Sequence, residues 1–325
     1  SFTSTHASGD TFNDGITTVT YTAMDAAGNT STSSFTVTVS DGEAPVISGN
    51  PTDITQTADA GLCSAVVTYT APTATDNVAI ASFTGDAASG DTFPVGTTTV
   101  TYTAIDDAGN TTTSDFTVTI TDDEDPAIAD TPSNITQTAD AGQCSAVINY
   151  TAPTASDNCA VTSFSGDAAT GDAFPVGTTT VTYTAVDPAG NTTTSSFTVT
   201  VTDDQDPAIA GTPANITQTA DAGICGAVVS WDDLTASDNC AVASLTGTHD
   251  SGDTFPVGAT SVTFTATDVN GNTTTSTFTV TVTDDEDPSI SGTPEDITQT
   301  ADAGLCGAAV SYTPPTAADN CGVDS

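Results

Sequence analysis

The chain contains no lysine and no arginine, whereas it contains 42 aspartates and glutamates, and its formal net charge is −42 over 325 residues. Nucleic acids and anionic membranes are bound through basic side chains, so neither is an expected partner. Lys–Asn isopeptide crosslinks are also excluded, because they require lysine. The acids receive no counter-charge from the chain itself, so we expect cations from solution to bind or screen them, the alternative being that they only aid solubility in salty water.

Long apolar runs and catalytic groups are also scarce. No stretch approaches the ~18 consecutive apolar residues that a membrane-spanning helix requires, so we expect no membrane insertion. The two histidines, His6 and His249, occupy equivalent turn positions at which two other repeats have Ala87 and Ala168. Because no nucleophile, base and orienting acid recur together, we expect no enzymatic activity.

The sequence repeats itself with a period of 81 residues and without insertion. Such a long period is typical of a string of independently folded domains. The units meet at an acidic hinge, T-D-D-E-D-P at 121–126, which returns unchanged at 283–288 and in variant form at 40–45 and 202–207. Boundaries at these hinges predict a C-terminal half-domain at 1–42, complete domains at 43–123, 124–204 and 205–285, and an N-terminal half-domain at 286–325.

Each half-domain needs the strands that it lacks. We expect one continuous long polypeptide to supply them from neighbouring sequence, and strand exchange between short subunits is the alternative.

Within one repeat, short alternating segments are separated by turns every 8–12 residues. Residues 97–105 alternate threonine with Val100, Tyr102 and Ala104, and after the turn D-D-A-G-N the segment 114–121 alternates in the same way. This pattern indicates half-buried strands joined by a hairpin. About seven such strands predict an all-β fold of tandem immunoglobulin-like antiparallel β-sandwiches in an end-to-end rod.

Several motifs recur in fixed order. They are P-x-D-I-T-Q-T-A-D-A-G-x-C-x-A-V, then D-N-C, then G-D-T-F-P-V-G-T-T-x-V-T-Y-T-A-x-D-x-x-G-N and F-T-V-T-V-T-D. Over the whole chain this series resembles the hyalin repeat, or HYR, domain. The resemblance implies an immunoglobulin-like sandwich and an association with cell adhesion and extracellular matrix, usually within large secreted proteins. Two departures stand out: N-D-G at 13–15 replaces P-V-G, and Val78 replaces a cysteine.

Acidic side chains from three segments should meet at one end of each sandwich: the hinge, the loop after the second strand, and the last hairpin. Carboxylate and amide oxygens, six to eight around one ion, are the ligands that calcium takes. A single aspartate is as readily a turn or capping residue, but three converging segments favour a metal. The candidate ligands are Asp41, Glu43, Asp76, Asp106, Asp122, Asp123, Glu124, Asp125, Asp157, Asp187, Asp203, Asp204, Asp206, Asp238, Asp268, Asp284, Asp285, Asp287 and Asp319, with Asn158 and Asn191 beside them.

The seven cysteines recur at two repeat positions, which indicates disulfides and an extracellular or cell-surface location. Pairing of neighbours within a domain would place the two cysteines at opposite ends of a strand, roughly 20 Å apart at ~3.3 Å per residue, whereas a disulfide tolerates about 7 Å between Cα atoms. We therefore favour pairing between consecutive domains, unless a long loop folds back. The favoured pairs are Cys63–Cys159, Cys144–Cys240 and Cys225–Cys321, and the alternatives are Cys144–Cys159, Cys225–Cys240 and Cys306–Cys321.

The hairpins also carry Asn-x-Ser/Thr sequons, which are weak glycosylation signals in a threonine-rich chain: Asn29, Asn110, Asn191 and Asn272. The function that we predict is structural and adhesive, a segment of an extracellular stalk or filament. Its partners would be neighbouring repeats and other cell-surface or matrix components. The alternative is a spacer or carbohydrate-binding array in a large secreted hydrolase, against which Trp231 stands as a lone tryptophan rather than a cluster of exposed aromatics.

Overall fold

The structure, a computed structural model, describes residues 1–324, so Ser325 at the end of the last predicted half-domain lies outside it. Residues 1–324 form β-strands, turns and loops without a helix, which confirms the predicted all-β class. No helix able to span a membrane is found among them. By internal contacts the chain divides into two compact units, Ser1–Thr131 with Ala152–Asp167 and Thr182–Ser196, and Pro132–Thr151 with Ala168–Val181 and Phe197–Ser325.

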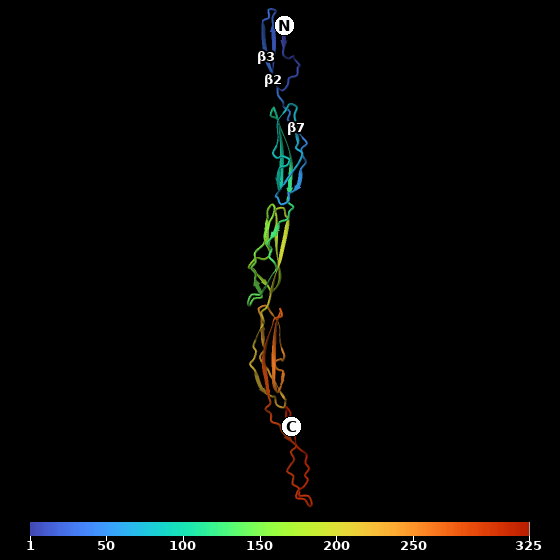
Figure 1. Ribbon diagram of the computed structural model, residues 1–325, viewed down its shortest axis with the longest axis vertical. Helices are drawn as coiled ribbons and strands as arrows, with labels where there is room; N and C mark the ends of the chain where they lie inside the picture. The colour runs from blue at the N-terminus through green and yellow to red at the C-terminus, as the bar shows by residue number, and fades with distance from the viewer. Residues whose placement is uncertain (325) are drawn as a thin grey trace. The chain divides into compact units, whose positions relative to one another are not determined.

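The first unit begins with a three-stranded antiparallel sheet (Figure 1). Its strands are β1 (Phe2–Ser4), β2 (Gly15–Met24) and β3 (Thr30–Val39), in the order β1-β2-β3. Val19 lies opposite Phe35 in the β2–β3 pairing, and Thr17 lies opposite Val37. These inward positions give the sheet one apolar face.

The next 81 residues form a complete sandwich. A four-stranded sheet in the order β5-β11-β10-β8 faces two short ribbons, β4-β7 and β6-β9. The strands are β4 (Val46–Ser48), β5 (Ile54–Thr57), β6 (Ser64–Val66), β7 (Thr73–Thr75), β8 (Ile80–Gly85), β9 (Thr92–Pro94), β10 (Gly96–Asp106) and β11 (Thr111–Thr121).

One strand pair departs from the antiparallel expectation. β5 pairs parallel with β11, whereas β4 pairs antiparallel with β7. Pro51 lies between β4 and β5, and a proline has no N–H to continue a ladder. The first strand of the domain is therefore broken there, and its two parts join different sheets.

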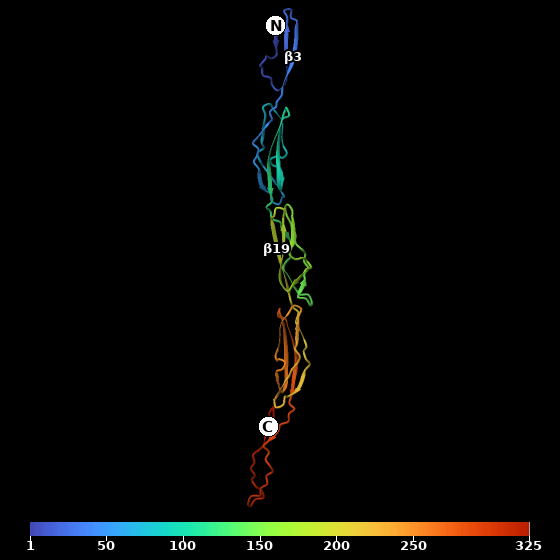
Figure 2. The same ribbon diagram turned by 180° about the vertical axis from the view of Figure 1, so that it is seen from behind.

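The same topology returns one period later and again one period after that. The longest strands of these copies are the paired β18 and β19 (Figure 2) and their equivalents β26 and β27. The bounds are β12 (Ala127–Ala129), β13 (Ile135–Thr138), β14 (Ser145–Val147), β15 (Thr154–Ser156), β16 (Ser163–Gly166), β17 (Ala173–Pro175), β18 (Gly177–Val186), β19 (Thr192–Thr202), β20 (Ala208–Ala210), β21 (Ile216–Thr219), β22 (Gly226–Val228), β23 (Thr235–Ser237), β24 (Val242–Gly247), β25 (Thr254–Pro256), β26 (Gly258–Asp268) and β27 (Thr273–Thr283).

The last described segment has two strands, β28 (Ser289–Ser291) and β29 (Thr316–Ala318), which pair antiparallel.

The core of each sandwich is built from the alternation read in the sequence. In the domain at 43–123, Val100, Tyr102, Phe116 and Val118 are buried, while the threonines between them face outward. The Tyr69 ring meets the edge of Phe116 with centroids 5.0 Å apart. Tyr102 belongs to the same buried cluster, so its ring has a packing role.

A glycine is needed where β8 passes this tyrosine. A Cβ atom on Gly85 would lie 2.8 Å from the Tyr102 ring, which is closer than side-chain atoms approach one another. The same contact recurs between Gly166 and Tyr183.

We expect Phe116→Ala to destabilise its domain by about 3–5 kcal/mol, because it opens a cavity against Tyr69 and Val118. Thr117→Ala, on the outward face of the same strand, should change stability by less than about 0.5 kcal/mol. Calorimetric unfolding of both variants checks this, and equal shifts would contradict the assigned strand faces.

Candidate functional site

The hairpin between β10 and β11 holds the acidic hinge at 40–45 in place. The backbone and side-chain amides of Asn110 donate to the two carboxylate oxygens of Asp106, each at 2.7 Å. The same Asn110 side chain donates to the backbone carbonyls of Glu43, at 3.1 Å, and Asp41, at 3.4 Å. Asn191 makes the corresponding bonds to Asp122 and Glu124 at 3.2 and 3.3 Å. The hairpin therefore fixes the hinge backbone by hydrogen bonds alone.

The hairpin carboxylates are turn-stabilising groups. Asp106, Asp187 and Asp268 are buried in the described chain, and their oxygens accept from the backbone N–H groups and the asparagine side chain of their own hairpins. Burial raises the pKa of each carboxyl, but the hydrogen bonds from Asn110, Asn191 or Asn272 outweigh it, and the pKa is lower than usual.

Acidic side chains of the hinge and of the loop after the second strand come together. At the hinge 121–126, carboxylate oxygens of Asp122 and Asp157 lie within 4.8 Å of each other, and Asp203 and Asp238 do the same one period later. At the hinge 40–45 the group consists of Asp41 and Asp76 with the hairpin Asp106. The other two hairpin aspartates are not members of such a group.

Cysteine sulfur atoms are close to two of these groups but offer no thiolate. Cys159 lies beside Asp122 and Asp157, and Cys240 lies beside Asp203 and Asp238. Both sulfur atoms are bonded in disulfides. The available donors are therefore oxygen atoms.

Several of these oxygens have no hydrogen-bond partner although they are buried. Asp122 is 8% exposed and Asp203 is 9% exposed, yet one carboxylate oxygen of each is unpartnered. Unpartnered buried oxygens are costly, and carboxylates most of all, so such atoms call for an ion or a water. The buried, unpartnered hinge and loop oxygens are Asp41 Oδ2, Asp76 Oδ1, Asp122 Oδ2, Asp157 Oδ1, Asn158 Oδ1, Asp203 Oδ2, Asp238 Oδ1, Asn239 Oδ1 and Asn320 Oδ1.

Other hinge acids turn outward or make different contacts. Glu124 Oε2 accepts the Gly61 backbone N–H at 2.8 Å, in a turn of the preceding repeat. Gln205 and Glu286 do the same for Gly142 and Gly223. Glu124 and Glu286 are themselves exposed, and the other exposed acids of the hinges are Glu43, Asp123, Asp125, Asp204, Asp206, Asp284, Asp285 and Asp287, whereas Asp319 is half-buried.

Consecutive repeats are joined by disulfides. Within residues 1–324 the bonds are Cys63–Cys159, Cys144–Cys240 and Cys225–Cys321, each with Cα atoms 4.6 Å apart and a sequence separation of 96 residues. These are the inter-repeat pairs and not the 15-residue pairs. Cys306 is exposed and unbonded. Disulfides of this kind belong to an oxidising, extracellular setting.

The asparagine of D-N-C makes a contact that sequence reasoning missed. Asn158 Nδ2 donates to the backbone carbonyl of Leu62, next to Cys63, at 3.1 Å, and to Asp122 Oδ1, also at 3.1 Å. Asn239 repeats both bonds with Gln143 and Asp203 at 3.0 and 3.1 Å. The motif recurs at 157–159, 238–240 and 319–321, but nothing in the sequence indicates that its asparagine amide contacts a residue 96 positions earlier.

The structure also shows the surroundings of the sequon asparagines and of Trp231. The sequon side chains Asn110, Asn191 and Asn272 are engaged in the hairpins, and Asn29 donates to Asp25 at 3.0 Å. Trp231 is half-buried against the rings of Phe255, Phe264 and Phe278 rather than displayed on a surface.

Comparison with known proteins finds the same family in each successive repeat. The family described as "HYR domain" matches residues 1–39, 40–120, 121–201 and 202–282. Hyalin of Lytechinus variegatus is 41% identical over 334 residues, covering 98% of this chain and 63% of that protein. Hyalin of Strongylocentrotus purpuratus is 39% identical and is covered over 28% of its length. The chain thus spans less than two thirds of either relative.

Among solved structures, the extracellular cadherin domains 1–4 of protocadherin gamma B7 give a TM-score of 0.33 at 14% identity, with 82% of this chain and 83% of that chain covered. Domains EC1–4 of Drosophila N-cadherin give a TM-score of 0.27 at 14% identity, with the same two coverages.

The lowered pKa of Asp187 predicts an acid-sensitive domain. A carboxyl whose folded pKa is depressed contributes stability that is present above its ordinary value of 3.8 and is lost as pH falls through the folded pKa. Melting curves in EDTA from pH 6 to pH 2 should therefore show the advantage of the wild type over Asp187→Asn shrinking below about pH 4. Asp123→Asn, at an exposed position, serves as control. A difference that stays constant with pH would contradict the assignment.

Proposed function

Because this chain belongs to the HYR-domain family, we propose that it is a structural, adhesive segment of an extracellular stalk or filament, with junctions stiffened by calcium and fastened by disulfides. Its working units are the half-domain 1–42, the domains 43–123, 124–204 and 205–285, and the half-domain 286–325. Its partners are neighbouring repeats and other cell-surface or matrix components. We propose no catalytic role.

The observation that carries the calcium assignment is the set of buried, unpartnered oxygens at the junctions. Asp122 Oδ2, Asp157 Oδ1 and Asn158 Oδ1 come from two segments of the chain that the hairpin and the disulfide already hold together. Hard oxygen donors of this kind suit calcium, which completes a shell of six to eight ligands with water and backbone carbonyls. With no lysine or arginine in the chain, no side-chain ammonium or guanidinium can neutralise them.

Calcium bound at the junctions would oppose bending there. The ion would link the hinge to the loop after the second strand, and its charge would offset the repulsion between carboxylates less than 5 Å apart. The disulfide at the same junction, for example Cys63–Cys159, would prevent separation of the repeats when the ion is lost. A chain built in this way transmits tension from one domain to the next through covalent bonds.

The alternative, a carbohydrate-binding array of a secreted hydrolase, lacks an observation in its favour. Such a module needs exposed aromatic platforms, whereas Trp231 packs on three phenylalanine rings.

Calcium should stabilise the chain and act through Asp122. At a free calcium concentration of about 100 Kd the gain is about 2.7 kcal/mol per site, provided that the unfolded chain does not bind. Asp122→Asn should reduce the calcium-dependent rise in melting temperature and remove one site in titration calorimetry. Asp123→Asn, which removes the same charge from an exposed neighbour, should leave both unchanged. Equal behaviour of the two variants, or a wild type indifferent to calcium and EDTA at moderate ionic strength, would leave the acids as a solvated surface.

The disulfides should be recovered as links between repeats. Because the chain has no trypsin sites, peptide mapping under non-reducing conditions needs a protease that cleaves at acidic or aromatic residues. We expect the peptide containing Cys144 to be linked to the one containing Cys240. A link from Cys144 to Cys159 would refute the proposed fastening, and fully free thiols would refute the oxidising location.

A further inference from the structure

The outward face of the four-stranded sheet is an array of threonine and serine side chains. In the domain at 205–285 this sheet has the order β21-β27-β26-β24, and it packs Val262, Phe278 and Val280 into the core. The residues between the core positions point away from it, and cross-strand pairing places them on one face. They are Thr217, Thr219, Ser244, Thr246, Ala259, Ser261, Thr263, Thr265, Thr267, Thr273, Thr275, Thr277, Thr279, Thr281 and Thr283.

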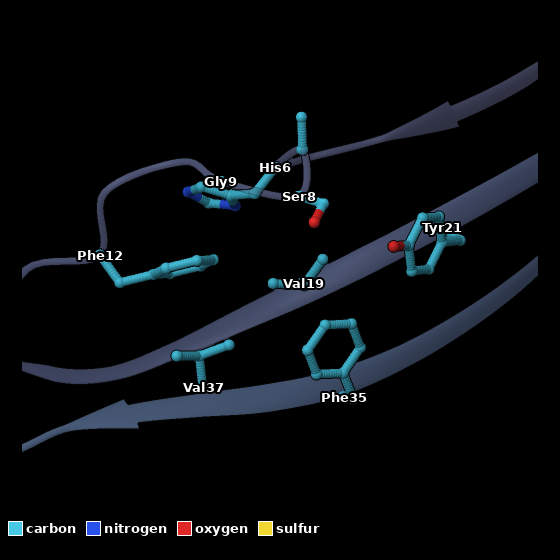
Figure 3. A pocket seen from close by; sticks show the side chains of 9 residues that line it. His6, Ser8, Gly9, Phe12, Val19, Tyr21, Phe35 and Val37 are labelled. Atoms are coloured by element: carbon cyan, nitrogen blue, oxygen red, sulfur yellow. The ribbon is translucent and has the colours of Figure 1, made fainter.

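The same division into an apolar and a hydroxyl face occurs in the sheet β1-β2-β3. Figure 3 shows Val19, Tyr21, Phe35 and Val37 on one side of β2 and β3, where they line one hollow. The residues between them face the other side. Among these are Thr18, Thr20, Ser34 and Thr36.

The hydroxyl face is almost free of charge in a chain whose net charge is −42. The acids of residues 205–285 lie in hinges, turns and loops, apart from Asp268, which is buried at the end of β26. The domain at 43–123 has one acid at the outward strand positions, Asp115, and the domain at 124–204 has Ser196 in its place. Threonine is favourable in any strand, but a neutral face on so acidic a chain decides what can approach it.

Hydroxyl groups of neighbouring strands are paired across this face. Thr263 Oγ1 and Thr277 Oγ1 are 3.3 Å apart, and Thr97 Oγ1 and Thr119 Oγ1 are 3.1 Å apart. Covering a polar group costs free energy when the group loses hydrogen bonds to water, and a hydroxyl that already has a partner in the sheet loses fewer of them. The threonine methyl groups add apolar area. The face is therefore covered at a low desolvation cost.

The charge of the chain indicates which partner fits this face. A basic partner would bind the acidic hinges and loops, whereas an acidic partner is repelled there and approaches closely where both surfaces are neutral. A second copy of this chain is such an acidic partner. We propose that two copies associate laterally through the outward threonine faces of their four-stranded sheets, packed about 10 Å apart as in other sheet-on-sheet contacts. The inference goes beyond the proposed function, because it uses neither the calcium sites nor the disulfides.

The area of one face indicates how many repeats the contact needs. The strands β21, β24, β26 and β27 have 4, 6, 11 and 11 residues. At ~3.3 Å per residue and ~4.8 Å between strands they cover roughly 500 Å². A stable interface buries about 800 Å² on each partner, so one domain falls short of it. The contact must therefore involve at least two repeats of each copy, and the tandem arrangement supplies them at a high effective concentration.

Sedimentation velocity in EDTA tests for this association without calcium bridges between carboxylates. The chain carries Cys306→Ser, which removes the exposed free thiol. We expect species larger than one copy as the protein concentration rises, and more of them at about 0.5 M than at about 0.05 M salt, because salt screens the repulsion between acids and leaves a neutral contact intact. A chain that stays monomeric at both salt concentrations overturns the proposal.

Added charge tests the face itself. The triple variant Thr99→Asp, Thr180→Asp and Ser261→Asp places one carboxylate at the same exposed outward position of each complete domain. It should weaken association about tenfold or more, because like charges of the two copies then meet in the contact.

The matched control adds the same charge to the other side of each sandwich. Thr73→Asp, Thr154→Asp and Thr235→Asp lie at exposed positions of the short ribbons that the four-stranded sheet faces. This triple variant should leave association unchanged. Equal effects of the two triple variants would place the contact elsewhere and overturn the proposal.

Crosslinking gives a second measurement that does not depend on how the added carboxylates affect folding. In the Cys306→Ser chain, Ser261→Cys introduces a single thiol on the outward face, and Thr235→Cys introduces one on the ribbon side of the same domain. With a bifunctional maleimide, Ser261→Cys should give covalently linked pairs of chains in large excess over Thr235→Cys. Equal yields, or a higher yield from Thr235→Cys, would exclude the threonine face as the contact.

Discussion

The structure depends on how a chain without basic side chains satisfies its buried carboxylates. Lysine and arginine normally supply the donors for such groups, and here the donors are backbone N–H groups and asparagine amides. Asp106 is an example, because both of its oxygens receive hydrogen bonds from Asn110. The hairpin aspartates are satisfied in this way, whereas Asp122 and Asp157 are each left with one oxygen unpartnered. The difference separates the acids that hold the fold from those available to an ion.

In the D-N-C motif at 157–159, each of the three residues makes a different contact at the junction between repeats. Asp157 accepts the N–H groups of Cys159 and Ala160 with one oxygen and leaves the other unpartnered. Asn158 donates to the hinge and to the preceding repeat, and Cys159 bonds covalently to that repeat. Where Val78 replaces the cysteine, the adjacent Asn77 still reaches Asp41, at 3.2 Å. The amide contact with the hinge therefore persists without the covalent bond.

Much of the fold could be predicted from the sequence, because strand alternation is a local property. The alternation of inward Val100, Tyr102 and Ala104 with outward threonines could be read from the sequence, and the structure confirms the all-β class. The parallel pairing of the edge strand β5 could not be predicted, because its choice of partner depends on the break at Pro51 and on strands distant in sequence. The sequence predicted even less about which acids are buried and which are exposed. Asp122 and Asp123 are adjacent and chemically identical, but one is buried and the other exposed, and only the pleat of the chain entering the hinge decides which.

Repetition makes the energetics of this chain nearly local, because each repeat contacts only its neighbours. Each sandwich buries its own core, so its stability combines its own packing with the bonds at its junctions to neighbouring repeats. Each of the complete sandwiches buries an equivalent phenylalanine, at positions 116, 197 and 278. That core belongs to each repeat alone, whereas the Cys63–Cys159 disulfide and the hydrogen bond from Asn158 to Leu62 join one repeat to the next.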